Sequence, residues 1–140
     1  MGVPLPSYRG VETMTTTSSH QHHWEPTGSP SHRTSNPRVS VVIPALNEAR
    51  SLAEVLWQVP RVHQVILVDG RSADGTVEIA RRIRPDLTVV HQGRRGKGNA
   101  LAAGFLEVTG DVVVTLDADG SADPSEIPVF VAALLAGADV

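Results

Sequence analysis

Residues 39–49 read VSVVIPALNEA, and they join a strand-like run to the start of a helix-like period. The first five residues, Val39–Ile43, are nearly all apolar, which is typical of a strand buried on both faces. From Ala49 onward, apolar residues recur at the three- and four-residue spacing of one helix face. A buried strand that leads directly into an amphipathic helix predicts the first half of a β-α-β unit.

The same alternation is repeated after this stretch. Further apolar runs occupy residues 65–68, 87–90 and 112–116, and helical periods occupy residues 76–83, 101–108 and 127–134. Because such crossovers are right-handed, this order predicts an α/β fold with a doubly wound, mostly parallel sheet and flanking helices. The last residues, 136–140, resemble the entry to another strand, so we expect the sheet to be incomplete at the C-terminus.

Several residues suit the ends of the expected helices. We expect Asn47 and Asp74 to cap the first two helices, and Asp123 to cap the fourth. We expect Gly110 and Gly137 to end the third and fourth helices.

Residues 1–37 differ in character from residues 38–140. They are rich in Ser, Thr, Pro and His and lack an apolar period, so we predict a disordered tail followed by one folded domain. A cluster of His20, His22 and His23 can bind transition metals adventitiously, but we favour a solvated tail.

The composition excludes several classes of protein. The formal charge is -3, which gives no basic footprint for nucleic acid. The chain has no cysteine, so it can form neither a disulfide nor a thiolate metal site. No apolar run approaches the roughly 20 residues of a membrane span. We therefore expect a cytoplasmic protein, with peripheral membrane association left open.

Polar or glycine-rich clusters follow all four expected strands, at the edge of the sheet where ligands bind in this architecture. Asp69 can accept hydrogen bonds from a ribose or a base, or it can simply fix the following turn. The run Gly96-Lys97-Gly98 opens the third helix, where backbone N–H groups and a lysine suit a phosphate. A solvated basic turn is the alternative for that run.

Asp117 and Asp119 follow an apolar strand and form the sharpest feature of the chain. Two neighbouring carboxylates repel each other, and a bound divalent cation would remove that repulsion. Hard oxygen ligands suit Mg²⁺ or Mn²⁺, and a diphosphate would supply the remaining ligands. A solvated acidic turn is the alternative. A calcium loop is excluded because the required glycine and terminal glutamate are missing.

Four segments together resemble glycosyltransferase family 2, which consists of inverting enzymes with the GT-A fold. They are VVIPALNEA (41–49), VDGRSADGT (68–76), GRRGKGNALAAG (93–104) and LDADGSADP (116–124). The sequence departs from the family pattern at Gly70, where many members have a second Asp. It also has Ser121 where polyprenyl-phosphate sugar synthases often have Gln. The sequences of the last two segments nevertheless resemble those enzymes slightly more than other members of the family.

The resemblance implies a role for particular residues in donor binding. It places Pro44, Ala45 and Glu48 along a nucleoside pocket, Asp69 at the base or ribose, Lys97 near the nucleotide, Asp117 at the ribose or metal, and Asp119 at the metal. It further implies that residues 38–140 are the nucleotide-sugar-binding part of a truncated GT-A domain.

The implied reaction is metal-assisted transfer of a sugar, with inversion, from a UDP- or GDP-sugar to a polyprenyl phosphate or a glycan. The general base of such enzymes lies beyond the position that corresponds to residue 140, so the sequence predicts none here. One alternative is a catalytically incomplete module that only binds the nucleotide sugar. A remote alternative is a phosphatase of the haloacid-dehalogenase type, with Asp117 as nucleophile.

Overall fold

The computed structural model describes residues 12–15 and 36–137. Five parallel strands form one sheet in the order β1-β5-β2-β3-β4. The strands are β1 (Glu12–Thr15), β2 (Val39–Ala45), β3 (Gln64–Asp69), β4 (Thr88–His91) and β5 (Val112–Thr115). The helices are α1 (Ala49–Gln58), α2 (Thr76–Ile83), α3 (Lys97–Phe105), the 3₁₀ turn η1 (Pro124–Glu126) and α4 (Ile127–Leu135). The predicted doubly wound α/β fold is confirmed.

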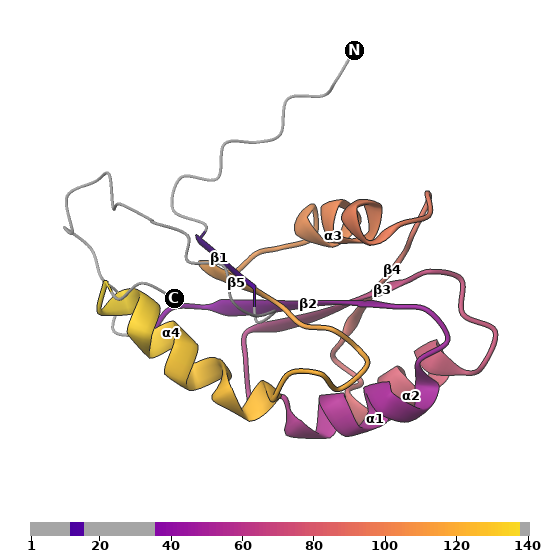
Figure 1. Ribbon diagram of the computed structural model, residues 1–140, viewed down its shortest axis with the longest axis horizontal. Helices are drawn as coiled ribbons and strands as arrows, with labels where there is room; N and C mark the ends of the chain where they lie inside the picture. Colours follow the sequence, from indigo (N-terminus) through magenta and orange to yellow (C-terminus); the bar gives the residue numbers. More distant parts are fainter. Residues whose placement is uncertain (1–11, 16–35, 138–140) are drawn as a thin grey trace, which may run out of the picture.

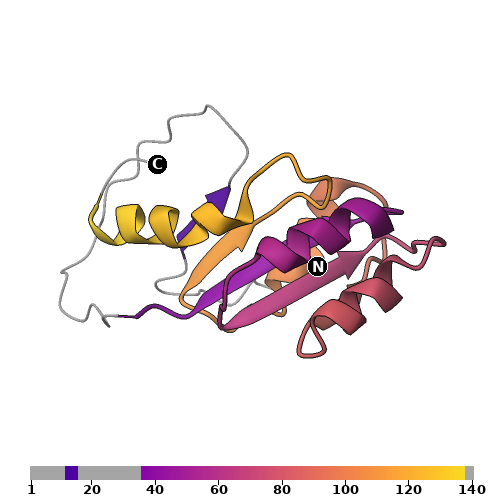
Figure 2. The same cartoon turned by 90° about the horizontal axis from the view of Figure 1, so that it is seen from below.

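Helices cover both faces of the sheet. Figure 1 shows the sheet nearly edge-on, with α3 on one face and α1, α2 and α4 on the other. Figure 2 views the molecule from the side of these three helices. Successive residues of β2 divide between the two cores, because Val41 and Ile43 pack with the three-helix side while Val42 packs with α3. All three side chains are fully buried, as a strand covered on both faces requires.

Strand β1 lies within the segment predicted to be a disordered tail. Its backbone pairs with the outer edge of β5, with Glu12 opposite Val112 and Thr15 opposite Thr115. A strand added at a sheet edge gains its hydrogen bonds from the backbone, so it needs no apolar period to identify it. Residues 1–11 and 16–35, the histidine cluster included, lie outside the described residues, as do residues 138–140.

The start of α1 is capped differently from the prediction. Asn47 does not cap α1, because its Oδ1 accepts the N–H of Ala73 at 2.8 Å. Asp74 instead accepts the first N–H of both helices, from Ala49 and from Thr76, at 3.1 Å each. Hydrogen bonds from the Thr76 hydroxyl and from the Ala49 N–H lower the pKa of Asp74. One carboxylate therefore ties the loop after β2 to the loop after β3.

The predicted C-terminal end of α4 is confirmed, whereas Asp123 caps the short turn η1 that leads into α4 instead of α4 itself. Asp123 accepts the N–H of Ser125 at 3.0 Å, and Pro124 follows it as the first residue of η1. At the other end, Gly137 takes a left-handed conformation with φ 76° directly after the helix. None of the described helices combines the length and the apolar character that crossing a bilayer would require.

The prediction that Gly110 ends α3 is wrong. The helix stops at Phe105, and Gly110 lies in the loop before β5. A Cβ atom at this position would lie 2.6 Å from the carbonyl oxygen of Arg38 and 2.6 Å from the Ser40 hydroxyl. Glycine is needed there because two backbone segments approach each other closely.

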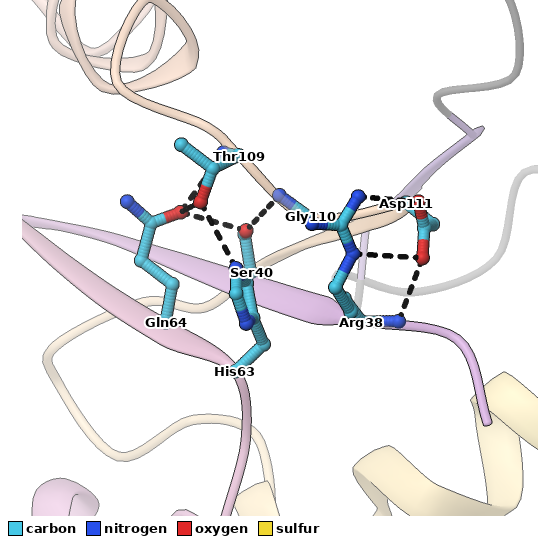
Figure 3. Close-up of polar contacts among 7 residues, drawn as sticks. All are labelled: Arg38, Ser40, His63, Gln64, Thr109, Gly110 and Asp111. Carbon is cyan, nitrogen blue, oxygen red and sulfur yellow. Dashed lines mark hydrogen bonds and ion pairs between the residues drawn. The ribbon is translucent and has the colours of Figure 1, made fainter.

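A polar cluster joins β2, β3 and the loop before β5 at the amino ends of the strands (Figure 3). The buried Ser40 hydroxyl accepts the Gly110 N–H at 2.9 Å and donates to Gln64 at 2.8 Å. Beside it, Arg38 pairs with Asp111 at 3.1 Å. The cluster lies at the opposite end of the strands from their carboxyl ends, so it fixes the sheet without entering the candidate site.

Candidate functional site

The site lies where the sheet reverses its winding. From β2 the chain proceeds to β3 and β4 on one side, and it then returns through α3 to β5 on the other side of β2. The loops after β2 and β5 therefore diverge, and a crevice opens between them at the carboxyl ends of the strands. An open pocket of about 500 Å³ occupies this place.

The pocket gathers residues from three segments of the chain. They are Pro44, Ala45, Leu46 and Glu48 after β2, Gln92, Gly96, Lys97 and Ala100 around the start of α3, and Asp117, Ala118 and Asp119 after β5. Of the seven residues predicted for the site, six line this pocket: Pro44, Ala45, Glu48, Lys97, Asp117 and Asp119. The exception is Asp69.

The spacing of the two acids sends both toward the pocket. Residues two apart in an extended segment share a face. Leu116 and Ala118 are buried in the core on the side of α1 and α4. Asp117 therefore points the other way, toward Lys97 of α3, and Asp119, in the turn that follows, lines the same pocket.

Lys97, the first residue of α3, reaches across the pocket to Asp117. Its Nζ lies 2.6 Å from Oδ1 of Asp117, which is the length of a charge-assisted hydrogen bond. The lysine side chain is 57% exposed, and the aspartate side chain is 21% exposed. The ion pair therefore lies at the open side of the pocket.

Asp119 is held as a carboxylate by its own turn. It accepts the N–H of Ser121 at 2.9 Å. Hydrogen bonds from the Ser121 side chain and N–H lower the pKa of Asp119, and the positive charge of Lys97 lowers it further. An ionised, exposed carboxylate is the form in which an aspartate ligates a divalent cation.

The two acids fit a hard divalent cation in part. Asp117 already accepts a cationic group, the Lys97 ammonium, so the position favours positive charge. Within residues 12–15 and 36–137, no group of three or more His, Cys, Asp or Glu residues is arranged to hold a metal. Two carboxylates leave several positions of an octahedral ion open to water or to phosphate oxygens, which is usual for Mg²⁺.

Glu48 and Asp69 have contacts that position the loops. Glu48 precedes α1, and its Oε2 accepts the Ser51 hydroxyl at 2.8 Å. Asp69 ends β3, is 3% exposed, and accepts the N–H of Ser72 at 3.2 and 3.3 Å. Nδ1 of His91 lies 3.5 Å from the same carboxylate. Asp69 thus fixes the turn after β3.

Gln92 is a site residue that the sequence analysis missed. Its Nε2 donates to the carbonyl oxygens of Gly96, at 2.7 Å, and Arg94. Its backbone N–H donates to the backbone carbonyl oxygen of Asp69 at 2.8 Å. Gln92 therefore holds the glycine-rich loop against the end of β4. Its position directly after a strand was the available signal, but a neutral amide in a polar loop has no distinctive spacing.

Comparison with known proteins identifies the relatives of this chain. The model of the family described as glycosyl transferase family 2 matches residues 40–140. An uncharacterized glycosyltransferase of Mycobacterium tuberculosis is 42% identical over 102 residues, which are 73% of this chain and 46% of that protein. The undecaprenyl-phosphate 4-deoxy-4-formamido-L-arabinose transferase of Edwardsiella ictaluri is 40% identical over 114 residues, covering 73% and 35%.

Solved structures that resemble this chain are also of enzymes that transfer a sugar. Glucosyl-3-phosphoglycerate synthase from M. tuberculosis, in complex with Mn²⁺, UDP and glucosyl-3-phosphoglycerate, superposes with a TM-score of 0.62 at 30% identity. The match covers 71% of this chain and 40% of that one. The complex of that synthase with Mg²⁺ and UDP superposes with a TM-score of 0.61. This chain spans less than half the length of these relatives.

Proposed function

Because this chain belongs to glycosyl transferase family 2, we propose that its pocket binds a nucleoside diphosphate sugar with Mg²⁺ or Mn²⁺, for transfer of the sugar to an acceptor. The observation that carries the proposal is the meeting of Asp117, Asp119 and Lys97 in one pocket at the reversal point of the sheet. Family membership leaves the haloacid-dehalogenase alternative without support.

The pocket has a positive and a negative part, and each suits a part of the donor. Asp117 and Asp119 would hold the metal, which when bound neutralises the charge of the departing diphosphate. The glycine-rich start of α3 offers backbone N–H groups and Lys97 to the phosphates. Pro44, Ala45 and Glu48, on the β2 side, would line the nucleoside. Asp69 remains a proposed contact of the base or ribose.

We propose UDP as the nucleotide of the donor, because the solved relatives bind UDP together with Mn²⁺ or Mg²⁺. The names of the relatives support an acceptor that carries a phosphate, either an undecaprenyl phosphate or phosphoglyceric acid. A polyprenyl phosphate is therefore favoured over a glycan. Such an acceptor needs little help from a general base, because a phosphate oxygen is already ionised. Inversion at the anomeric carbon is part of the proposal.

A second candidate for this chain by itself is donor binding without turnover. The match covers less than half of each relative, and the remainder of those proteins is available for acceptor binding, which favours this candidate. Calorimetric titration with UDP-glucose and GDP-mannose, each with and without Mn²⁺, followed by an assay for sugar release, separates the two candidates. We expect UDP-glucose to bind more tightly with Mn²⁺. Equal, metal-independent binding of both donors, or no binding, would refute the proposed function.

A further inference from the structure

Lys97 is placed so that its side chain has one well-defined partner. It is the only lysine of the chain. It follows Gly96, whose φ of 104° is a conformation that residues with a Cβ rarely adopt. This backbone turn starts α3 at the pocket wall and directs the lysine stem across to Asp117, 20 residues further along the chain.

The ammonium group and the divalent cation would compete for the carboxylate of Asp117. Among the residues that the structure describes, Lys97 is the only cationic side chain within 4.0 Å of a carboxylate of the pocket. A divalent cation bound to Oδ1 of Asp117 would lie next to the ammonium group, and the two positive charges would repel each other at that distance. Metal bound through Oδ1 therefore favours the departure of Lys97.

Charge balance indicates when that displacement is favourable. The three carboxylates of the pocket, those of Glu48, Asp117 and Asp119, and the one ammonium leave it with two negative charges. A divalent cation alone cancels them, whereas a cation that arrives with a doubly charged diphosphate restores them. Phosphate oxygens also offer the freed ammonium a new acceptor, and the flexible lysine stem allows the move. An exposed ion pair is weak, so giving it up costs little.

We propose that the Lys97 ammonium pairs with Asp117 in the empty pocket. It leaves Asp117 to the metal only when a diphosphate offers the ammonium another acceptor. Metal and nucleotide then bind cooperatively, and this side chain adds to the coupling that direct contact between metal and phosphate provides. The inference rests on the proposed function, because it takes the metal and the diphosphate as the ligands of the pocket.

The first test measures Mn²⁺ affinity by calorimetry in the wild type and in Lys97→Met, with and without UDP. In the wild type, UDP should raise Mn²⁺ affinity by about 5- to 150-fold, the usual range for coupled sites. In Lys97→Met, Mn²⁺ alone should bind more tightly and UDP more weakly, so that the coupling factor falls several-fold. Lys97→Arg, which keeps the cation, should retain part of the coupling.

Arg95→Met is the matched control, because it removes one positive charge two residues before Lys97, and Arg95 has no ion pair with Asp117. If Arg95→Met raises the affinity for Mn²⁺ alone as much as Lys97→Met does, the effect comes from the overall positive charge near the pocket and not from the ion pair with Asp117. The proposal then fails.

The single lysine permits a direct second test. In protein labelled only at lysine, one NMR side-chain signal reports the ion pair. Mg²⁺ without nucleotide should move it little at concentrations where Mg²⁺ with UDP moves it fully. A signal that shifts fully with Mg²⁺ alone would overturn the proposal. If UDP and Mn²⁺ bind but Lys97→Met leaves both affinities unchanged, only this inference fails. If neither binds the wild type, the proposed function itself fails.

Discussion

Replacing Gly104 by alanine tests how closely α3 must approach the sheet to hold the pocket in shape. Gly104 is buried on the inner face of α3. A Cβ atom there would lie 2.5 Å from Cγ1 of Val42 and 2.9 Å from Cγ2 of Val68. Carbon atoms pack at about 3.5–4.0 Å, so the helix or the valines would have to move by about 1 Å. Both valines are fully buried in central strands.

The expected change in the free energy of unfolding of Gly104→Ala is the difference between two effects. Overpacking of a filled core costs about 1–3 kcal/mol. Replacing glycine by alanine inside a helix returns up to about 1 kcal/mol of helix propensity. A contact of 2.5 Å with a buried side chain indicates the upper part of the overpacking range, about 2–3 kcal/mol. After the gain of about 1 kcal/mol in helix propensity, we expect Gly104→Ala to lower the free energy of unfolding by about 1–2 kcal/mol.

Gly98→Ala is the matched control in the same helix, because a Cβ at that position has no atom within 4 Å. It should leave stability unchanged or raise it by up to about 1 kcal/mol. Urea denaturation of the full chain, followed by circular dichroism, measures both variants. If Gly104→Ala is as stable as the wild type, the packing of α3 is looser than the distances require, and the reasoning is refuted.

Two further predictions concern polar contacts outside the pocket. Ser40→Ala removes the acceptor of the Gly110 N–H, so it should lower the free energy of unfolding by about 1–3 kcal/mol; a change within error in urea denaturation would contradict this. Asp74→Asn should destabilise the protein near neutral pH, because an amide has one acceptor oxygen for the two helix starts. The pKa of Asp74 is lowered by folding, so its contribution is complete above the usual carboxyl value of 3.8 and is lost as the pH falls through the lower folded-state value. The stability difference between wild type and variant should therefore shrink as the pH falls below 3.8, and a difference that grows there would contradict the assignment.

Much of the fold could be predicted because its signals are local. A strand buried on both faces needs a nearly continuous apolar run, and β2, β3 and β5 all have one, whereas the edge strand β4 is only partly buried. The rule that ligands bind at the carboxyl ends of parallel strands then identified the correct edge of the sheet. Six of the seven predicted site residues line one pocket for this reason.

What the sequence did not predict depends on contacts between distant segments. Asp74 caps α1 across 25 residues, and no local pattern distinguishes it from Asn47, which is nearer in sequence. Strand β1 pairs through its backbone alone. Lys97 was expected near the nucleotide, but its ion pair with Asp117 depends on the angle at which α3 leaves Gly96.

The most direct test of the whole account is the effect of Mn²⁺ on UDP affinity in Asp119→Asn. Asparagine keeps an oxygen for the Ser121 N–H, so the turn is preserved while the charge is removed. Asp123→Asn, which removes the same charge from a helix cap four residues away, serves as control. We predict that Mn²⁺ tightens UDP binding in the wild type and the control, and that Asp119→Asn loses at least about tenfold of this gain, as the loss of a metal ligand should. Equal tightening by Mn²⁺ in all three proteins would contradict the account.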